Sequence, residues 1–361
     1  MKILYIVPNI NNEGGVARVL SIKANYLLEK LGCEVLILTQ NNGDSALFYD
    51  FNPKIELHDI ILKGNKIAFF FQYVKKLNQK INLIKPDIII VCDNGLKAFT
   101  IPFVLKTKIP IIFESHGSKF IEEKQKNKFH FLAKVKLLFK DYSANKFAKF
   151  VALSNESLKE WNVINGIIIP NPLWFKTNQF SDLKAKKVIA VSRHSHEKGL
   201  ERLLLIWKKV VEKHPDWTLD IYGKYSENLG LQKIAQSLNI SKNVVFYEPV
   251  KNINDKYLEA SFYVMTSYYE GFPMVLIEAM ASGLPCIAYD CPCGPRAIIN
   301  NNQNGFLVEN ENLDTFVQKI ELLIEDENLR IQMGKKAQKN SEKYDLEFIM
   351  QQWKLLFESF V

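Results

Sequence analysis

Residues 262–288 read FYVMTSYYEGFPMVLIEAMASGLPCIA, and the fold class follows from this stretch more than from any other. It opens with the apolar run Phe262–Met265, which is typical of a strand buried on both faces. Gly271 permits a tight turn, and Pro273 suits the first turn of a helix because it has no N–H to lose. The helix that we expect from about Met274 ends at Gly283-Leu284-Pro285, where a second buried strand begins. A strand, a helix and a further strand make a βαβ unit.

The start of this expected helix is also a candidate anion site. Its first N–H groups have no partner inside the helix and lie at the carboxyl end of the preceding strand. Together with the positive end of the helix dipole, they suit a diphosphate. Glu270 lies in the loop before the helix, and Glu278 lies about one turn inside it. We therefore expect two carboxylates to flank a phosphate position without both touching it.

Cations for a phosphate site occur at Arg193 and Lys198. They belong to residues 191–199, VSRHSHEKG, which follow an expected strand at Lys187–Val191 and precede an amphipathic helix. Arg can bind two phosphate oxygens at once, while Lys acts as a point charge. The two cations should therefore lie at the same carboxyl edge of the sheet as the anion site.

The alternation of strands and helices extends over the whole chain. Further strands are expected at Ile3–Val7, Glu34–Leu38, Asp87–Val91, Pro110–Phe113, Phe150–Leu153, Ile167–Ile169, Thr218–Tyr222, Asn243–Phe246, Pro285–Ala288 and Gly305–Leu307. The rhythm breaks at Ile169-Pro170-Asn171-Pro172. This pattern predicts an α/β fold with two doubly wound, Rossmann-like domains, residues 1–172 and 173–345, facing each other across a cleft. Residues 346–361 form a last amphipathic helix that closes the second domain or packs back on the first.

Taken together, these motifs resemble those of the family 4 retaining glycosyltransferases of GT-B fold (glycosyl transferases group 1), of the type that assembles bacterial saccharides. The resemblance covers nearly the whole chain. Glu270 and Glu278 match the paired glutamates of the family, with Gly-Phe-Pro after the first. The other matches are the loop cations Arg193 and Lys198, the glycine loop Gly14-Gly15 and the turn Ile169-Pro170-Asn171.

The resemblance implies a role for each matching residue. Glu278 would bind the ribose hydroxyls of a nucleotide-sugar donor, and Glu270 would lie beside the sugar. Arg193 and Lys198 would hold the diphosphate as charge builds on it, and His116 would face the sugar from the N-terminal domain. The N–H groups of Val275 and Leu276 would bind phosphate, and the base would lie near Tyr222-Gly223 and Pro249-Val250. The full set of remaining implied donor contacts is Gly14, Gly15, Gly223, Val250, Gly271, Phe272, Pro273, Met274, Val275 and Leu276. The catalytic set would be Glu270, His116, Arg193 and Lys198.

The substrate class also follows from the resemblance. Tyr247-Glu248-Pro249 stands where the family commonly has a glycine turn near the base, and Ser192 stands where glycine often precedes the loop arginine. The run Asp290–Arg296 resembles one branch that handles N-acetylhexosamine or galactose donors. We expect transfer from a UDP-sugar to a hydroxyl of a saccharide or lipid-linked saccharide. The alternatives are a GDP-mannose-dependent mannosyltransferase and a nucleotide-sugar epimerase or hydrolase of the same fold.

The family mechanism implies no cofactor beyond the nucleotide-sugar co-substrate. A phosphate oxygen of the leaving group would take the proton of the acceptor, so the protein would position the substrates and stabilise charge. No Asp-x-Asp triplet occurs in the chain, which argues against nucleotide binding through a divalent metal. His194 and His196, like Cys291 and Cys293, are only two residues apart and lack the further ligands of a structural zinc site.

The positive charge is concentrated in the first half of the chain. Residues 1–175 hold 24 Lys and Arg against 15 Asp and Glu, whereas residues 176–361 hold 23 against 24. Nine lysines lie in Lys119–Lys149, interleaved with apolar residues. Such a segment suits an anionic membrane surface, and its alternative is a core-packed helix with a solvated lysine face.

The cellular location of the protein can be predicted from its cysteines, its N-terminus and its hydropathy. Five scattered cysteines suggest reduced thiols, Met1–Asn9 has no signal-peptide pattern, and no apolar run is long enough to span a bilayer. We expect a cytoplasmic protein, peripheral on the inner face of the cytoplasmic membrane. A nucleic-acid partner would leave the second domain unexplained, and the first turn lacks the G-x-G-x-x-G of a dinucleotide oxidoreductase.

Overall fold

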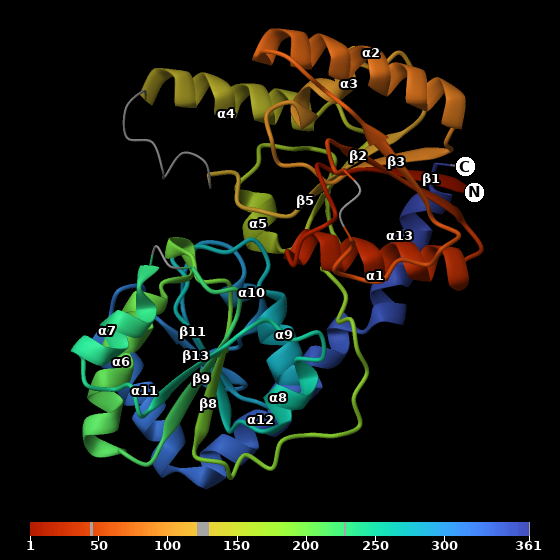
Figure 1. Cartoon of the computed structure of the whole chain (residues 1–361). Helices are drawn as coiled ribbons and strands as arrows, with labels where there is room; N and C mark the ends of the chain where they lie inside the picture. Colours follow the sequence, from red (N-terminus) through yellow and green to blue (C-terminus); the bar gives the residue numbers. More distant parts are fainter. Residues whose placement is uncertain (44–45, 121–129, 227–228, 361) are drawn as a thin grey trace. The chain divides into compact units, whose positions relative to one another are not determined.

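The computed structural model describes residues 1–361 except 44–45, 121–129, 227–228 and 361. The chain divides into two compact units (Figure 1). Unit 1 comprises Met1–Trp174 and Leu346–Val361, and unit 2 comprises Phe175–Asp345. Each unit is built on one parallel sheet with helices against it, which confirms the expected pair of Rossmann-like α/β domains.

Unit 1 contains a seven-stranded sheet in the order β3-β2-β1-β4-β5-β6-β7. The strand at Glu56–Ile60 was not predicted, because its residues ELHDI are partly exposed and form no continuous apolar run. It lies at the edge of the sheet, where burial on both faces is not required. The strands are β1 (Lys2–Ile6), β2 (Glu34–Gln40), β3 (Glu56–Ile60), β4 (Ile88–Val91), β5 (Ile111–Ser115), β6 (Lys149–Ala152) and β7 (Gly166–Ile168).

Helices cover both faces of this sheet. One face packs against α1 (Gly15–Glu29) and α13 (Leu346–Glu358), and the other packs against α2 (Lys66–Ile84), η1 (Ala98–Thr100), α3 (Ile101–Val104), α4 (His130–Ala144) and α5 (Asn155–Lys159). The last helix of the chain therefore belongs to unit 1. Its apolar stripe, with Ile349, Trp353 and Phe357, is buried in the same core as Tyr5 of β1.

Unit 2 contains a six-stranded sheet in the order β10-β9-β8-β11-β12-β13. All six strands lie where the sequence predicted them, to within one residue at either end. They are β8 (Lys187–Val191), β9 (Thr218–Tyr222), β10 (Val244–Tyr247), β11 (Phe262–Met265), β12 (Cys286–Tyr289) and β13 (Gly305–Val308). The helices are η2 (His196–Lys198), α6 (Leu200–Lys213), α7 (Leu231–Ser237), α8 (Asn254–Leu258), α9 (Met274–Ala281), α10 (Pro295–Ile298), α11 (Leu313–Glu325), α12 (Glu327–Ser341) and η4 (Glu342–Tyr344).

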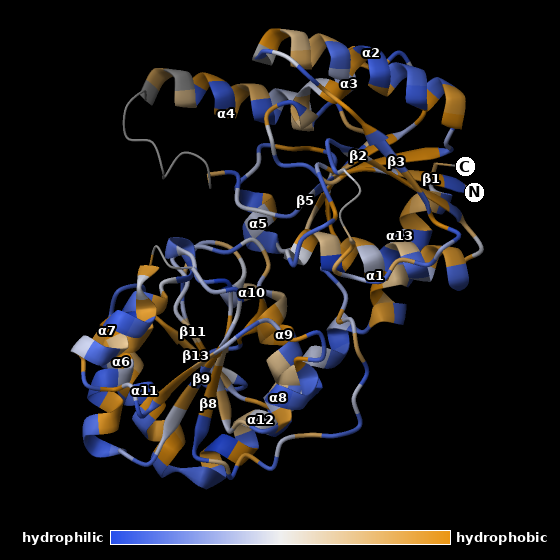
Figure 2. Ribbon diagram, viewed as in Figure 1, coloured by the Kyte–Doolittle hydropathy of each residue, from blue (hydrophilic) through white to orange (hydrophobic). Residues whose placement is uncertain are grey.

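The central strands of both sheets are strongly apolar, as Figure 2 shows. Their order reverses direction between β1 and β4 in unit 1 and between β8 and β11 in unit 2. Ligands of open parallel sheets bind beyond the carboxyl ends of the strands at such switch points. Across the described ranges, no helix is both long and apolar enough to cross a membrane.

Candidate active site

The first turn of α9 lies at the switch point of unit 2. The helix begins at Met274, as predicted, with Pro273 at its N-cap. The N–H of Leu276 donates to the carbonyl of Pro273 over 3.0 Å, so the expected phosphate contact from Leu276 stays a prediction and would require this hydrogen bond to be shared or given up. Within the described ranges, the N–H groups of Met274 and Val275 make no backbone hydrogen bond. These two N–H groups are therefore the ones available to an anion.

Lys198 and Glu270 form an ion pair beside this turn. The Lys198 Nζ lies 2.8 Å from Oε1 and 2.9 Å from Oε2 of Glu270. The Ser267 hydroxyl donates to Glu270 Oε1 over 2.6 Å. A carboxylate held by a cation and a hydroxyl is fixed in orientation. The sequence predicted both residues for the site but not that they would pair.

Two residues bring the loop after β8 against the loop after β11. Gly199 has φ +61°, and a Cβ there would lie 2.3 Å from the carbonyl oxygen of Thr266. Arg202 of α6 donates through Nε to Thr266 O and through Nη2 to Ser267 O, each over 2.6 Å. Its guanidinium also lies over the ring of Tyr268, 4.0 Å from the centroid. Arg202 thus fixes the backbone that carries Ser267 and Glu270.

The segment after β12 packs against the same loop. Gly294 has φ +113°, and a Cβ there would lie 2.4 Å from Cδ of Pro273 and 3.4 Å from Cβ of Glu270. Cys291 is buried nearby, and burial raises the pKa of its thiol to about 12. A neutral thiol is a packing group rather than a nucleophile. The sequence 290–296 therefore supports Glu270 and Pro273 through close packing.

Arg193 and Gly223 lie at the ends of neighbouring strands. The Arg193 side chain is 60% exposed, and its Nη2 lies 3.4 Å from Glu197 Oε1. A Cβ at Gly223 would lie 1.8 Å from the carbonyl oxygen of Ser192, so only glycine fits this approach between the loops. Val250 is partly buried in the loop after β10. An exposed arginine at a switch point is accessible to an anionic ligand.

Glu278 differs from Glu270 in its surroundings. Its side chain is fully buried inside α9, and Oε2 accepts a hydrogen bond from the hydroxyl of Tyr257 over 3.1 Å. The preceding positions Gly271, Phe272 and Pro273 form the turn between the two glutamates, with Phe272 packed edge-on against Tyr344. The structure thus separates a nearly buried carboxylate held by Lys198 from a fully buried one held by Tyr257.

The paired histidines of the loop after β8 have different environments. His194 is buried between the rings of Tyr225 and Phe246, and burial lowers the pKa of its imidazole. Neither ring nitrogen has a hydrogen-bond partner among the described residues. His196 is exposed and lies near the ring of Tyr268. A neutral imidazole with unpaired nitrogens can still bind a polar ligand group.

In unit 1, His116 belongs to a buried cluster at the carboxyl ends of β4 and β5. Its Nε2 lies 3.5 Å from Oε1 of Glu114. Lys23 of α1 donates to both oxygens of Glu114 over 2.6 and 2.7 Å, and its Nζ lies 3.7 Å from the ring centroid of Trp353 in α13. Burial alone would raise the pKa of Glu114, but Lys23 and His116 outweigh it and hold that pKa well below its ordinary value. The carboxylate is therefore ionised and orients His116.

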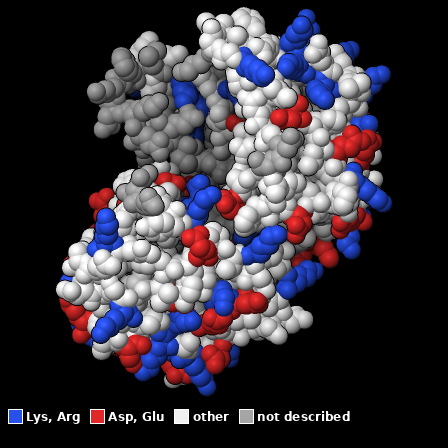
Figure 3. All heavy atoms as spheres, in the orientation of Figure 1, with Lys and Arg blue, Asp and Glu red and all other residues white. Residues whose placement is uncertain are grey.

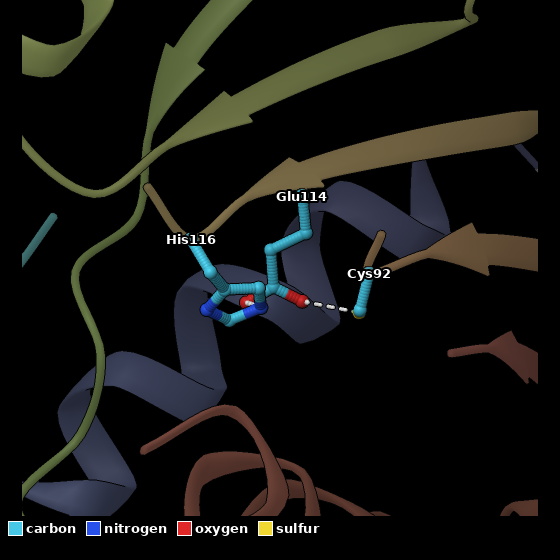
Figure 4. A group of neighbouring side chains, drawn as sticks. All are labelled: Cys92, Glu114 and His116. Atoms are coloured by element: carbon cyan, nitrogen blue, oxygen red, sulfur yellow. Dashed lines mark hydrogen bonds and ion pairs between the residues drawn. The ribbon is translucent and has the colours of Figure 1, made fainter. Parts of the chain in front are cut away.

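Cys92, Glu114 and His116 are also the one set of three potential metal ligands found among the described residues (Figure 4). The set does not fit a metal. Lys23 already occupies both carboxylate oxygens and would repel a cation. Burial raises the pKa of the Cys92 thiol well above its ordinary value, and its Sγ donates to Glu114 Oε2 over 3.4 Å.

The glycine loop of unit 1 precedes α1 at the end of β1. The Gly14 N–H donates to Oδ1 of Asn12 over 2.8 Å, and a Cβ at Gly14 would lie 2.5 Å from the same oxygen. Gly15 is exposed, with no atom within 4 Å of an added Cβ. Arg18, one turn into α1, lies over the rings of Tyr49 and Trp174. Gly14 thus has a structural reason to be glycine, and Gly15 has room for a ligand.

The Lys119–Lys149 segment is only partly accessible. Residues 121–129, which include Lys124, Lys126 and Lys128, lie outside the described residues. Lys119 is buried in an ion pair with Asp141 over 2.6 Å, and Lys140 is buried 5.5 Å from the ring centroid of Phe99. These two lysines therefore cannot contact a membrane surface or belong to a solvated face, because Asp141 and the Phe99 ring stabilise them inside the unit.

The structure brings together Lys198 and Glu270 of the predicted catalytic set, with Arg193 in the same loop as Lys198. Sequence reasoning missed Arg202, Lys23 and Glu114. A signal existed for the last two, since Lys23 lies on the apolar face of α1 and Glu114 interrupts the apolar strand IIFES. A charge inside an apolar pattern indicates a buried partner.

Comparisons of the sequence and of the structure with known proteins all point to glycosyltransferases. A model described as Glycosyl transferases group 1 matches residues 175–340. The chain is 31% identical to an uncharacterized glycosyltransferase of Haemophilus influenzae, over 98% of this chain and 99% of the relative. It is 29% identical to the amylovoran biosynthesis glycosyltransferase AmsD of Erwinia amylovora, over 98% of each. The structure is similar to that of TarM from S. aureus, with a TM-score of 0.80 and 19% identity over 99% of each chain.

These matches agree with the site. The family model spans nearly all of unit 2, and therefore the switch point that holds Lys198, Glu270 and the first turn of α9. The H. influenzae relative extends the similarity over unit 1 as well. The chain has the GT-B fold and belongs to the glycosyl transferases group 1 family.

Proposed function

We propose that this glycosyltransferase moves a hexose or N-acetylhexosamine from a UDP-sugar to a hydroxyl of a saccharide or lipid-linked saccharide, with retention of configuration at the anomeric carbon, as in family 4. The observation that carries the proposal is the pair of Lys198 and Glu270 beside the first turn of α9. It puts a cation, a carboxylate and available N–H groups at one switch point.

The pair suggests how a donor would be received. A diphosphate at the first turn of α9 would draw Lys198 toward itself, because phosphate oxygens compete with Glu270 for the ammonium. Glu270 would keep its hydrogen bond from Ser267 through Oε1, and Oε2 would become free to accept from a sugar hydroxyl. Ligand binding would thus convert an internal ion pair into contacts with both parts of the donor.

The chemical step then needs charge stabilisation more than proton transfer. As the bond from the anomeric carbon to the phosphate oxygen breaks, negative charge builds on the diphosphate, and Lys198 and Arg193 would offset it. The acceptor hydroxyl would attack from the face that the phosphate leaves, and a phosphate oxygen would take its proton. Two cations in this position also support a metal-independent reaction. For Glu278 and His116 we keep the predicted roles at the ribose and beside the donor sugar.

Two similar proteins support the choice of substrates. TarM has a crystal structure in complex with alpha-GlcNAc-glycerol and UDP, and AmsD is named for amylovoran biosynthesis. By similarity, we propose a UDP-sugar donor and an acceptor that belongs to a growing bacterial saccharide, with the reaction at the cytoplasmic side of the membrane.

A donor screen tests the proposal. Melting temperatures would be measured in EDTA with UDP-N-acetylglucosamine, UDP-galactose, UDP-glucose and GDP-mannose. We expect one UDP-sugar to raise the melting temperature, and Arg193→Ala and Glu270→Gln to abolish the rise. Lys208→Ala, on the surface of α6, is the control and should keep it. Stabilisation by GDP-mannose alone would move the assignment to a mannosyltransferase, and release of free sugar without acceptor would favour a hydrolase.

The anomeric configuration needs a separate measurement. With the active donor and an acceptor in hand, a proton NMR spectrum of the first product distinguishes the outcomes. An α-linked product from the α-linked donor supports retention, and a β-linked product excludes it.

A further inference from the structure

One face of unit 1 exposes large apolar side chains that the proposed donor site does not use. On α4, the residues Phe131, Val135, Leu138 and Tyr142 follow each other at spacings of three or four, so they form one stripe along the helix. All four are exposed, Phe131 by 76% and Leu138 by 68%. The opposite side of α4, with Lys140, Ser143 and Ala144, is the side that packs on the unit. The helix therefore exposes an apolar stripe of the kind that a surface helix ordinarily buries, in addition to Phe139, which packs against the core.

The stripe continues onto the neighbouring helices. Phe103 of α3 is exposed and stacks on Tyr142, with 5.7 Å between the ring centroids. Asn78 of α2 donates to the carbonyl of Val104 over 3.0 Å, which ties α2 to α3. Near its start, α2 exposes Ile67 and Phe71, one turn apart. Large apolar side chains gathered on one face of a unit mark a contact surface.

The charge of this face is almost entirely positive. Helices α2, α3 and α4 together contain seven lysines and a single acidic residue, Asp141. Asp141 is already paired with Lys119. Lys75 and Lys134 are exposed on α2 and α4. Figure 3 shows Lys and Arg side chains over α2 with few Asp or Glu among them.

We propose that the face of unit 1 formed by α2, α3 and α4 docks on an anionic lipid surface. Exposed Phe, Leu and Tyr side chains can enter the boundary between headgroups and acyl chains, while lysines beside them reach anionic headgroups. Lipid is favoured over a protein partner because the lysines are spread over α2 and α4, while the one acidic residue, Asp141, is paired with Lys119. The proposal is independent of the donor, since it concerns the sheet of unit 1 and not the Lys198–Glu270 site.

Vesicle binding tests this face directly. The full chain would be sedimented with two kinds of vesicle. One contains phosphatidylcholine alone, and the other contains phosphatidylcholine with about 30 mol% of the anionic lipid phosphatidylglycerol. We expect binding to the anionic vesicles that weakens with salt. Phe131→Ser with Leu138→Ser should weaken it by about tenfold, because two apolar side chains lose their burial in lipid. Leu355→Ser is the matched control, since Leu355 is exposed on α13, against the other face of the sheet.

Charge reversal supplies a second arm. Lys75→Glu with Lys134→Glu should reduce binding to anionic vesicles, and Lys335→Glu with Lys336→Glu on α12 is the matched control in unit 2. The proposal would be overturned if both double variants bound anionic vesicles equally well. It would also be overturned if the wild-type chain bound neutral vesicles as strongly as anionic ones.

A labelled cysteine shows which face meets the lipid. The five native cysteines are all buried, so a thiol probe should react selectively with Leu138→Cys or with the control Leu355→Cys. An environment-sensitive fluorophore at position 138 should shift to the blue with anionic vesicles, and one at position 355 should not. A wild-type dimer that Leu138→Ser dissociates in solution, with no vesicle response, would assign the face to a second copy of the chain instead.

Discussion

Two Lys–Glu pairs of nearly identical geometry lie in the two units. In unit 1, Lys23 reaches both oxygens of Glu114 over 2.6 and 2.7 Å, and each side chain is 2% exposed. In unit 2, Lys198 reaches both oxygens of Glu270 over 2.8 and 2.9 Å, with side chains 19% and 9% exposed. The pairs differ in access to solvent and in what surrounds them, not in contact geometry.

That difference fits a structural role for the pair in unit 1 and the donor-binding role that we propose for the pair in unit 2. Lys23 lies between Glu114 and the ring of Trp353, so α1, β5 and α13 are held together with no room for a competing anion. Lys198 ends η2 at a switch point, where the diphosphate of the proposed donor would compete with Glu270 for it. A buried ion pair costs desolvation and is strongly destabilising when broken from one side, whereas an accessible pair can exchange partners.

The largest expected effect is on the buried pair. Lys23→Met should lower the free energy of unfolding by about 3–5 kcal/mol, because it leaves the Glu114 carboxylate buried without its counter-ion. The double variant Lys23→Met with Glu114→Gln should recover part of the loss. Urea unfolding followed by circular dichroism measures both. A single variant as stable as the wild type would mean that Glu114 finds another counter-ion.

The same substitution in unit 2 should change activity instead of stability. Lys198→Met should lower kcat by about 10²–10³-fold, the usual cost of losing one group that stabilises developing charge. Its unfolding free energy should fall by less than that of Lys23→Met, since Lys198 and Glu270 retain more solvent exposure than Lys23 and Glu114. Steady-state kinetics and urea unfolding on one preparation measure the contrast. A loss of stability with unchanged kcat would reverse the roles assigned to the two pairs.

Acid should act on the buried pair through Glu114. The folded protein holds the pKa of this carboxyl well below its ordinary value, so the unfolded chain takes up a proton first as the pH falls. The contribution of Glu114 to stability is complete above about pH 4.5 and decreases below it by up to about 1.4 kcal/mol per pH unit. Unfolding free energies of wild type and Glu114→Gln should therefore converge between about pH 4.5 and 3. A constant difference would contradict the assigned pKa direction.

The smallest effect is expected at a surface pair. Lys208 and Glu212 of α6 lie 3.2 Å apart with both side chains exposed. Lys208→Ala should change the unfolding free energy by less than about 0.5 kcal/mol and leave kcat unchanged, because solvent screens the pair. The same urea and kinetic measurements apply. A larger effect would show that the distance between the charged atoms, rather than their burial, decides how much an ion pair contributes to stability.

Much of the fold could be predicted because its signals are local. All six strands of unit 2 are apolar runs between turn residues, and the start of α9 follows from Pro273. Strand β3 escaped prediction because an edge strand needs no apolar run. The Lys198–Glu270 pair joins residues 72 positions apart, and Arg202 acts on a loop 64 positions away. No periodicity encodes such pairings.

The sequence by itself determined the class of fold and the family and supplied the candidate residues of the proposed donor site, since apolar periodicity and the Glu270 to Glu278 spacing are read along the chain. Tertiary structure alone decided which charges meet and which are accessible. It buried Lys23 and Glu114, turned the apolar side of α4 outward and joined α13 to unit 1. The physical reason is that burial and pairing depend on packing between segments far apart in sequence, and the free energy of a charge depends on that packing.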